Sequence, residues 1–419
     1  MNLEKYSIGI GDRFGMEGAA QLRALVEAKK LGVDIVPVWN KSNREHNLIG
    51  TSPDNVRIEA DAAVSKLGWR ASYYVDADHI GLATVDKFIA SSDFYTIDVA
   101  DYIGKPATAE SIDAFLRDMS EFKGTLQIPG VDAAVEVNDA LLLDVAKKYL
   151  YAIEEAGKVY RHIVAKKGEK RFVAEVSVDE ADKPQNPIEL FFILAGIARE
   201  KISIQTIAPK FTGSFLKGID YVGDIRQFAR EFGDDISVIA FAVKTFNLPE
   251  NLKLSVHSGS DKFSLYPVMH AAIAKYKAGL HLKTAGTTWL EEVIGLAASG
   301  KDGLKIAKEI YETAFGRFDE MAKPYLPVIQ IDRTKLPEPR EVAGWDAQRF
   351  VETLRHDQSN KLYSIHFRQL VHIGFRIAAE MGEKYTHCLT EYRAEIEKNV
   401  TENLLDRHIR PLFLGHAAD

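Results

Sequence analysis

The sequence is almost without cysteine, since Cys388 is the single one among 419 residues. A disulfide framework and a thiolate metal cluster both need several cysteines, so the sequence excludes both. Any metal ion bound by this chain would therefore be held by histidine, aspartate or glutamate side chains.

An excess of basic residues and a long apolar run are also missing. A formal net charge of -7 and a pI near 6.0 give no electrostatic footprint for nucleic acid, so we expect a small-molecule ligand. No run of about eighteen apolar residues occurs, and the N-terminus shows no leader pattern, which predicts a cytoplasmic protein without a membrane partner. The segment GIGDRFG lacks the GxGxxG spacing, which predicts no nucleotide cofactor.

Short β-rich runs alternate with helical patterns from the N-terminus onward. This alternation is typical of parallel strands joined by crossover helices, and eight such units predict an α/β protein with a (β/α)8 TIM barrel. The expected strands are residues 6–13, 33–40, 70–78, 94–99, 171–178, 202–209, 251–257 and 279–284.

The expected domain organisation follows from this pattern. Residues 1–334 form the catalytic barrel, which includes a helical insertion after the fourth strand at about residues 101–168. Residues 335–419, opened by the proline-spaced KLPEPREV, form an α-helical C-terminal extension packed on the barrel.

Histidines and carboxylates gather where the expected strands end. The active site of a TIM barrel lies at these C-terminal strand ends, and His79, His257 and His281 occupy them. Three imidazoles with an open coordination position are typical of a catalytic site for one divalent metal cation, and they suit zinc, manganese, cobalt, nickel or iron. Asp78 and Glu175 are the candidate catalytic carboxylates. The alternative is a set of unconnected polar residues at strand ends.

Cationic and hydroxyl side chains share this distribution, which predicts an anionic, hydroxyl-rich substrate. The loop SGSDK has the composition of an anion-binding nest, and TAGTT precedes a helix whose backbone N–H groups suit a carboxylate. The residues expected to bind substrate are Arg13, Lys210, Ser258, Ser260, Asp261, Lys262, Lys283 and Thr284.

Two cationic residues leave alternatives open. Arg13 fits either a bidentate contact with an anion or an ion pair at the barrel rim. Lys217 fits a ligand contact and a solvated surface position equally well.

Three longer segments, APKFTGSFLKGIDYVGD, KLSVHSGSDKFSLYP and LHLKTAGTTWLE, resemble signature segments of the tagaturonate epimerase family. Its members are bacterial metal-dependent isomerases of hexuronate catabolism, so the resemblance implies interconversion of D-tagaturonate and D-fructuronate, with a sugar acid as substrate. A more remote likeness to the class II metal-dependent aldolases implies that His79, His257 and His281 bind the metal. The same likeness implies that Asp78 is the base and that SGSDK holds the anionic end of the substrate.

The chemistry of C4 epimerisation also favours an aldolase-like mechanism. The proton on a carbinol carbon beta to a ketone is not acidified by the carbonyl group, so simple enolisation cannot invert that carbon. Retro-aldol cleavage and re-addition can, with Asp78 taking the hydroxyl proton and Glu175 carrying the second proton. A class II-type aldolase, another ketose or sugar-acid epimerase, and an inactive carbohydrate-binding barrel are the alternatives. The oligomeric state, a homo-oligomer included, stays open.

Overall fold

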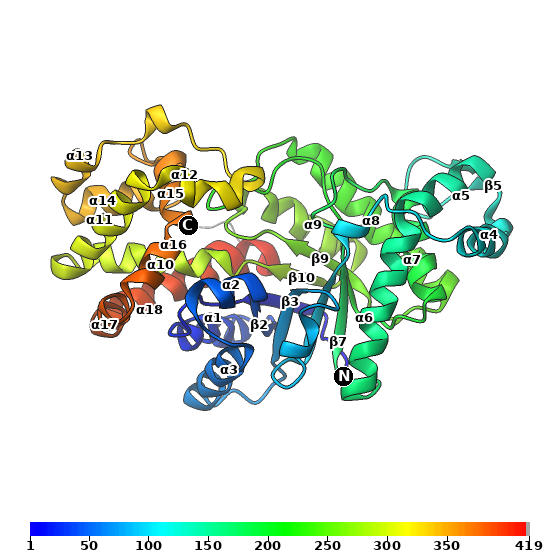
Figure 1. Cartoon of the computed structure of the whole chain (residues 1–419), viewed down its shortest axis with the longest axis horizontal. Coiled ribbons are helices and arrows are strands. Elements are labelled where there is room, and N and C mark those ends of the chain that lie inside the picture. Colours follow the sequence, from blue (N-terminus) through cyan, green and yellow to red (C-terminus); the bar gives the residue numbers. More distant parts are fainter. Residues whose placement is uncertain (416–419) are drawn as a thin grey trace.

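Eight parallel strands close into one barrel in the middle of the molecule (Figure 1). The structure, a computed structural model, describes residues 1–415. The barrel order is β1-β2-β3-β4-β7-β8-β9-β10, with β10 pairing back to β1. The strands are β1 (Tyr6–Ile10), β2 (Val36–Ser42), β3 (Tyr74–Ile80), β4 (Phe94–Asp98), β7 (Val173–Ser177), β8 (Thr206–Ala208), β9 (Lys253–His257) and β10 (Leu280–Lys283). Each expected strand overlaps one of these, and the predicted TIM barrel is confirmed.

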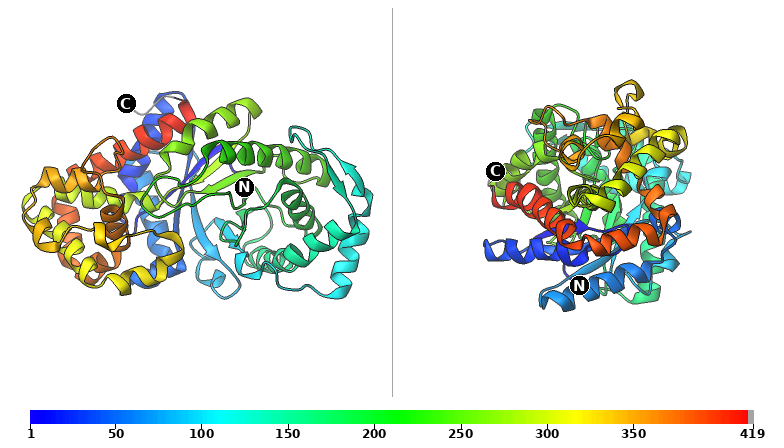
Figure 2. Two further views of the ribbon diagram at one scale, coloured as in Figure 1. Left: turned by 90° about the horizontal axis from the view of Figure 1, so that it is seen from above. Right: turned by 90° about the vertical axis from the view of Figure 1, so that its left-hand side faces the viewer.

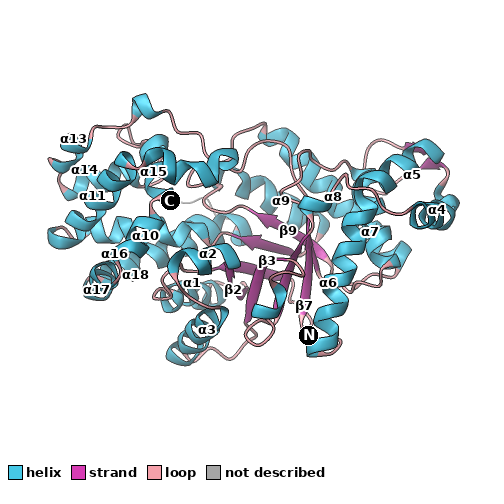
Figure 3. Cartoon of the chain, in the orientation of Figure 1, coloured by secondary structure: helices cyan, strands magenta, loops and turns pink. Residues whose placement is uncertain are grey.

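Helices cover the outside of the barrel (Figure 3). They are α1 (Gly18–Lys30), α2 (Asn43–Ile49), α3 (Pro53–Leu67), α6 (Tyr151–Lys167), α7 (Pro187–Arg199), α8 (Ile225–Phe246) and α9 (Tyr266–Tyr276), with 3-10 turns η1 (Val85–Lys87) and η5 (Phe263–Leu265). The sequence marks their starts, because Ser42 and Asn186 form capping boxes at α2 and α7. No helix within residues 1–415 is both long and apolar enough to cross a bilayer.

The barrel interior changes from apolar to polar along the strands. Its floor is an apolar cluster near the strand starts, made of Leu3, Val36, Val38, Tyr74, Phe94 and Val173. Because side chains alternate along a strand, the next inward positions after Tyr74, Phe94 and Val173 are Asp76, Thr96 and Glu175. The Thr96 hydroxyl contacts both carboxylates, at 3.0 Å and 3.3 Å. A polar layer therefore lies directly on the apolar floor.

The segment between β4 and β7 differs from the purely helical insertion expected at residues 101–168. It contains η2 (Ala100–Tyr102), α4 (Ala109–Asp118), η3 (Ser120–Phe122), β5 (Gly124–Leu126), β6 (Val135–Val137), α5 (Asp139–Val145) and the π-helix η4 (Ala146–Leu150) before α6. The strands β5 and β6 pair antiparallel, and α6 packs on β4 as a crossover helix of the barrel. The insertion therefore includes a small sheet and ends near residue 150. Its elements α4, β5 and α5 lie at the opposite end of the molecule from α17 and α18 (Figure 1).

The chain after β10 builds a second hydrophobic core, here called the C-terminal lobe (residues 286–402). Its elements are α10 (Gly286–Ala298), α11 (Lys301–Gly316), α12 (Phe318–Ala322), η6 (Lys323–Val328), η7 (Arg333–Lys335), α13 (Pro339–Ala343), α14 (Ala347–Leu354), α15 (Ile365–Ile373), α16 (Phe375–Met381), α17 (Glu383–Glu391) and α18 (Arg393–Glu402). Trp289 of α10 already belongs to this core, so the boundary expected at residue 335 falls inside the lobe. The final π-helix, η8 (Asn403–Leu414), returns to pack on α1 and α9 of the barrel (Figure 2).

A group of buried carboxyls lies at the seam between the barrel and the C-terminal lobe. Asp12 accepts backbone N–H groups of Phe14 and Glu17 at 2.8 Å and 2.7 Å. Both carboxyl oxygens of Glu17 are buried without a hydrogen-bond partner. Burial, followed by the charge of Asp12, raises the pKa of Glu17 to about 8. Glu17 therefore keeps its proton in the folded protein at neutral pH.

This raised pKa predicts a loss of stability at alkaline pH. The unfolded chain releases the Glu17 proton near its ordinary pKa of 4.5, whereas the folded protein holds it up to about 8, so stability should fall as pH rises through this window. Glu17→Gln removes the ionisable group and should raise the free energy of unfolding at about pH 8.5 by a few kcal/mol, at about 1.4 kcal/mol per pKa unit. Urea unfolding at about pH 5 and pH 8.5 measures this, with Glu27→Gln, a partly exposed carboxylate of α1, as the control. An equal gain at both pH values would contradict the explanation.

Candidate active site

The C-terminal end of the barrel brings two imidazoles and a carboxylate together. His79 lies near the end of β3, His257 ends β9, and Asp179 follows β7. Each offers one potential ligand atom, and these atoms lie within 4.8 Å of one another. The ring centres of His79 and His257 are 5.3 Å apart. This spacing suits one metal ion, and no second group of this kind occurs in residues 1–415.

An irregularity in β3 brings His79 to this group. Its φ of 49° lies in the left-handed region that residues with side chains rarely adopt. The pairing of β3 with β4 also shifts register between Ala77 and Ile80, which is typical of a bulge that redirects a side chain. Backbone strain of this kind is found at functional sites, where surrounding contacts hold it. As a result, the consecutive residues Asp78 and His79 both contribute to the site.

Carboxylates fix the orientation of both rings. Asp98, the last residue of β4, lies 2.9 Å from Nδ1 of His79. Glu175 lies 2.7 Å from Nε2 of His257, and Asp179 lies 3.0 Å from Nδ1 of the same ring. A carboxylate on one imidazole nitrogen leaves the other nitrogen directed at a metal. Asp98 occupies Nδ1 of His79, and Glu175 occupies Nε2 of His257. The potential ligand atoms are therefore Nε2 of His79, Nδ1 of His257 and a carboxylate oxygen of Asp179.

The local charges fit a bound cation. Burial opposes a charge on His257, but Asp179 and Glu175 outweigh it and raise the pKa of His257 to about 9. Asp78 and the hydrogen bond with Asp98 outweigh burial in the same way and hold the pKa of His79 well above its ordinary value. Two imidazolium protons thus balance the carboxylates. A divalent cation would take over this role with the imidazoles neutral, so the residues fit such an ion.

Lys283 joins the carboxylates at the centre of the site. Its ammonium nitrogen lies 2.7 Å from Asp76, 2.8 Å from Asp78 and 3.3 Å from Glu175. It also donates to the Thr96 hydroxyl. These carboxylates outweigh burial and hold the pKa of Lys283 well above its ordinary value. Lys283 lies in the site as expected, but its N–H donors are directed at protein oxygens.

The two aspartates of β3 differ in their access to a substrate. The Asp76 side chain is 0% exposed and that of Asp78 is 14% exposed. Asp78 lies 3.8 Å from Nε2 of His79, so it faces the potential metal ligands. Burial would raise the pKa of Asp78, but Lys283 and His79 lower it to about 2, whereas burial raises the pKa of Asp76 to about 6. Asp78 is therefore the ionised carboxylate that a substrate beside His79 can reach.

Glu175 lies deeper in the barrel than Asp78 and is fully buried. Its Oε1 contacts His257 and Lys283, while Oε2 has no hydrogen-bond partner. Lys283 and His257 outweigh burial and hold the pKa of Glu175 well below its ordinary value. Oε2 is therefore a buried acceptor that no protein donor fills.

His281 is not brought together with the other two imidazoles. In the pairing of β9 with β10, Lys283 lies beside His257, whereas His281 lies beside Ser255, two residues deeper in the barrel. Two residues of a strand correspond to about 6.6 Å. Nδ1 of His281 is 2.9 Å from the Ser7 hydroxyl, and burial lowers the pKa of His281 to about 3. The expected third imidazole ligand is therefore replaced in the geometric group by Asp179.

The SGSDK loop also differs from the anion nest that we expected. The hydroxyl of Ser258 donates to the Lys283 carbonyl, and that of Ser260 accepts the backbone N–H of Gly218. Lys262 is completely buried and donates to the Leu216 and Asp261 carbonyls and to Ser260. All three polar side chains therefore bind protein groups within the fold.

Asp261 and Thr284 connect this part of the barrel to later helices. Asp261 is fully buried and accepts hydrogen bonds from Arg368 at 2.7 Å and from Thr287 at 2.7 Å. Arg368 outweighs burial and holds the pKa of Asp261 well below its ordinary value. The Thr284 hydroxyl is 3.1 Å from Nε2 of His408 in η8. We therefore correct the expected substrate-binding role of the loop to a structural one.

Two predicted cationic residues do lie around the barrel mouth. Arg13 follows β1 and is mostly buried, and its nearest carboxylate is Glu45 at 3.5 Å. Lys210 follows β8 and is half-buried, with its backbone N–H donated to Gln185. Arg13 therefore has the ion pair at the barrel rim that was one of its two alternatives, and its contact with an anion stays a prediction.

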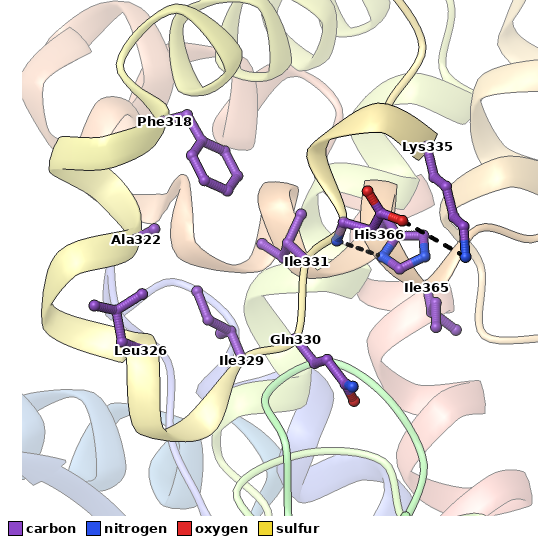
Figure 4. A pocket seen from close by; sticks show the side chains of 10 residues that line it. Phe318, Ala322, Leu326, Ile329, Gln330, Ile331, Lys335, Ile365 and His366 are labelled. Carbon is purple, nitrogen blue, oxygen red and sulfur yellow. Dashed lines mark hydrogen bonds and ion pairs between the residues drawn. The ribbon is translucent and has the colours of Figure 1, made fainter.

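A separate pocket of about 550 Å³ lies in the C-terminal lobe between η6, η7 and α15 (Figure 4). It is lined mainly by apolar side chains, including Phe318, Leu326 and Ile365. Nδ1 of His366 accepts the backbone N–H of Asp332 at 3.0 Å. The pocket has no group of potential metal ligands, so the reactive residues are those of the barrel mouth.

Sequence reasoning missed Asp98 and left Asp179 out of the metal ligands. Both follow the rule that identified the others, because Asp98 ends β4 and Asp179 lies two residues after β7. His372 of α15 lies close to Gly218 and Gly286, and no signal in the sequence marks this position, because only the folded C-terminal lobe brings it there.

A TIM barrel with acid–base and potential metal-binding side chains at its C-terminal end is the architecture of an enzyme. The sequence profile of the tagaturonate epimerases matches residues 1–412, and the chain belongs to the tagaturonate epimerase family. It is therefore a carbohydrate epimerase, which confirms the predicted family and the isomerase class.

Individual relatives agree with this assignment. A tagaturonate/fructuronate epimerase of Thermotoga maritima is 30% identical over 383 residues, which cover 88% of this chain and 72% of the relative. The native crystal structure of the fructuronate-tagaturonate epimerase of Cohnella laeviribosi superposes with a TM-score of 0.80 at 23% identity, covering 98% of this chain and 82% of that chain. A complex of the same protein with one glycerol superposes with a TM-score of 0.79 at 23% identity, covering 97% and 82%. These superpositions support the TIM-barrel fold of this chain.

Proposed function

We propose that this chain interconverts D-tagaturonate and D-fructuronate by metal-dependent epimerisation at C4, through retro-aldol cleavage and re-addition. The observation that carries the proposal is the group of His79, Asp179 and His257, with Asp78 directly beside it. A divalent cation held by this group would act as a Lewis acid toward the ketone oxygen of the substrate. The substrate is inferred from the family, and the retro-aldol mechanism is inferred from the residues of the site.

Asp78 starts the reaction as the base. Its carboxylate accepts the proton of the C4 hydroxyl, the C4–O bond becomes an aldehyde carbonyl, and the C3–C4 bond breaks. The electron pair of that bond forms an enediolate on the C1–C3 fragment. When the aldehyde has turned its other face to C3, the bond forms again and Asp78 returns the proton.

Glu175 and Lys283 support these proton movements. Glu175, ionised and with one free oxygen next to His257, accepts the C3 hydroxyl proton as the enediolate forms and returns it when the C3–C4 bond forms again. Lys283 keeps Asp78 and Glu175 ionised by its positive charge, because it lies within 3.3 Å of both. Preorganised charges of this kind stabilise the transition state without reorganisation during the reaction.

The test is to incubate metal-loaded and chelated enzyme with D-tagaturonate and to follow the products by NMR. We expect D-fructuronate with the loaded enzyme and little conversion after chelation. Release of two three-carbon fragments would instead indicate an aldolase, and binding without turnover would indicate a carbohydrate-binding barrel. Equal turnover with and without chelator would contradict the metal dependence of the reaction but not the epimerase activity itself.

A further inference from the structure

Three cationic side chains surround two aromatic rings at the barrel mouth. The guanidinium of Arg13 lies 4.6 Å from the centre of the Phe375 ring. The guanidinium of Arg44 and the ammonium of Lys217 lie 5.7 Å and 5.8 Å from the centre of the Tyr325 ring. The centres of the two rings are 6.5 Å apart. We call Arg13, Arg44 and Lys217 the cation cluster.

The cation cluster joins two parts of the chain. Arg13 and Lys217 lie in the segments after β1 and β8, and Arg44 lies in the first turn of α2, directly after β2, so all three come from the C-terminal end of the barrel. The rings belong to η6 and α16 of the C-terminal lobe, which therefore forms one wall of the barrel mouth. The backbone N–H of Lys217 also donates to the Val328 carbonyl of η6 at 2.8 Å and fixes the loop to this wall.

The cluster has too little negative charge to balance it. Within residues 1–415, Glu45 is the one carboxylate that lies within 4 Å of a cationic group of the cluster, at 3.5 Å from Arg13. Nε of Arg13 is buried and has no hydrogen-bond partner. Burial, followed by the charge of Arg13, lowers the pKa of Lys217 to about 8. Like charges held together at a partly buried site favour a bound anion.

A buried imidazole adds a further polar group to this place. His372 of α15 packs against Gly218, the residue after Lys217, where a Cβ atom would lie 3.2 Å from His372 Cβ. Its Nδ1 is buried without a hydrogen-bond partner. After burial, the charges of Arg13 and Lys217 are the largest influences that hold its pKa well below the ordinary value. His372 is therefore a neutral ring without a hydrogen-bond partner, next to the segment that carries Lys217.

Glu45 places the cluster next to the reacting groups. Ser42 pairs with Asp78 across β2 and β3, and Glu45 lies in the first turn of the helix that begins directly after Ser42. After burial, the charge of Arg13 is the largest influence on the pKa of Glu45, and Asp78 also contributes. A ligand with one end at Asp78 can thus extend toward Arg13.

We propose that Arg13, Lys217 and His372 bind the terminal carboxylate of the sugar acid substrate. The proposal rests on the proposed function and adds a role to it. Cleavage of the C3–C4 bond leaves C4, C5 and the C6 carboxylate in one aldehyde-acid fragment. An anchored carboxylate keeps this fragment in the site while its aldehyde turns. The cluster then selects acids over neutral ketoses, and it keeps the reaction an epimerisation by preventing fragment release.

The first experiment compares an acid with a neutral substrate. Lys217→Met and Arg13→Met should each lower kcat/KM for D-tagaturonate by roughly 10- to 100-fold, the range expected for a lost charge-assisted hydrogen bond. The value for D-tagatose, which lacks the carboxylate, should stay nearly constant. Lys323→Met is the matched control, because it removes an exposed cation from the same turn that carries Tyr325. An unchanged ratio of acid to ketose in both folded variants would overturn the proposal.

The second experiment measures fragment release during turnover. NMR should detect dihydroxyacetone, the protonated C1–C3 fragment, in a larger fraction of turnovers by Lys217→Met than by wild type or Lys323→Met. Binding of a hexonate, which has no ketone and cannot react, separates this proposal from the proposed function. Calorimetry should show weaker hexonate binding by Lys217→Met even if the wild type did not turn over D-tagaturonate. Equal hexonate affinity in wild type and Lys217→Met would refute the carboxylate site.

Discussion

His79→Ala and His257→Ala are expected to lose the bound metal ion and, with it, turnover of D-tagaturonate by about a thousandfold or more, since Lewis-acid stabilisation supplies several kcal/mol. The reason is geometric, because each ring offers one of three potential ligand atoms within 4.8 Å, and Asp179 offers the third. A pair of remaining ligands holds an ion weakly. Metal content after dialysis is measured by mass spectrometry, and turnover is followed by NMR.

His281→Gln is the matched control for these variants. It removes an imidazole from the same barrel, but from a position two residues deeper than His257, where its partner is Ser7. We expect normal metal content in His281→Gln. Metal loss in this variant, with retention in His79→Ala, would show that the ligand set is wrong.

The same ligand set predicts how metal affinity changes with pH. A metal ion binds the neutral imidazole and competes with protons. Because the pKa of His257 is about 9 without metal, affinity should rise steadily between about pH 6 and pH 9. Titration with a metal indicator at several pH values measures this.

The barrel and several of its reactive residues could be predicted because both depend on local pattern. Alternation along each strand sets which side chains face inward, and parallel strands in a barrel end on one face. His257, Asp78 and Glu175 could therefore be found from the sequence as residues of one site. The same rule applied to Asp98 would have completed the carboxylates around His79.

The depth of a residue in the barrel could not be predicted, because it depends on the register between strands. His281 has the correct parity for the interior, yet its pairing with Ser255 places it below His257. For His79 the opposite holds, since parity alone would direct it away from Asp78. The register shift in β3 brings both residues to the site, and nothing in ASYYVDADHIG marks that shift.

The role of the SGSDK loop could not be predicted because its partners lie far along the chain. Asp261 binds Arg368, more than a hundred residues later. A buried ion-pair centre and an anion nest have the same composition of small, hydroxyl and charged residues. Only tertiary contacts separate them, and these also bring His372 and Tyr325 to the barrel mouth.

Asp78→Asn should lower turnover about a hundredfold or more, the contribution typical of a general base, while metal content stays unchanged. The amide keeps the size of the side chain but cannot accept the C4 hydroxyl proton. Asp78 is suited to this step because it is ionised and lies 3.8 Å from His79 Nε2. Single-turnover measurements by rapid quench should show the loss in the chemical step, with substrate affinity largely kept.

Asp76→Asn tests whether Asp78 is the base or whether its loss acts only through the shared ion pair with Lys283. Both aspartates contact Lys283, at 2.7 Å and 2.8 Å, so each substitution removes one carboxylate from the same ammonium group. If the effect of Asp78→Asn came only from this lost ion pair, Asp76→Asn would reduce turnover equally. We expect instead that Asp76→Asn keeps most of the activity and mainly lowers stability, because Asp76 is fully buried and binds Thr96. An inactive Asp76→Asn beside an active Asp78→Asn would make Asp76 the base and would require a substrate path into the polar layer of the barrel.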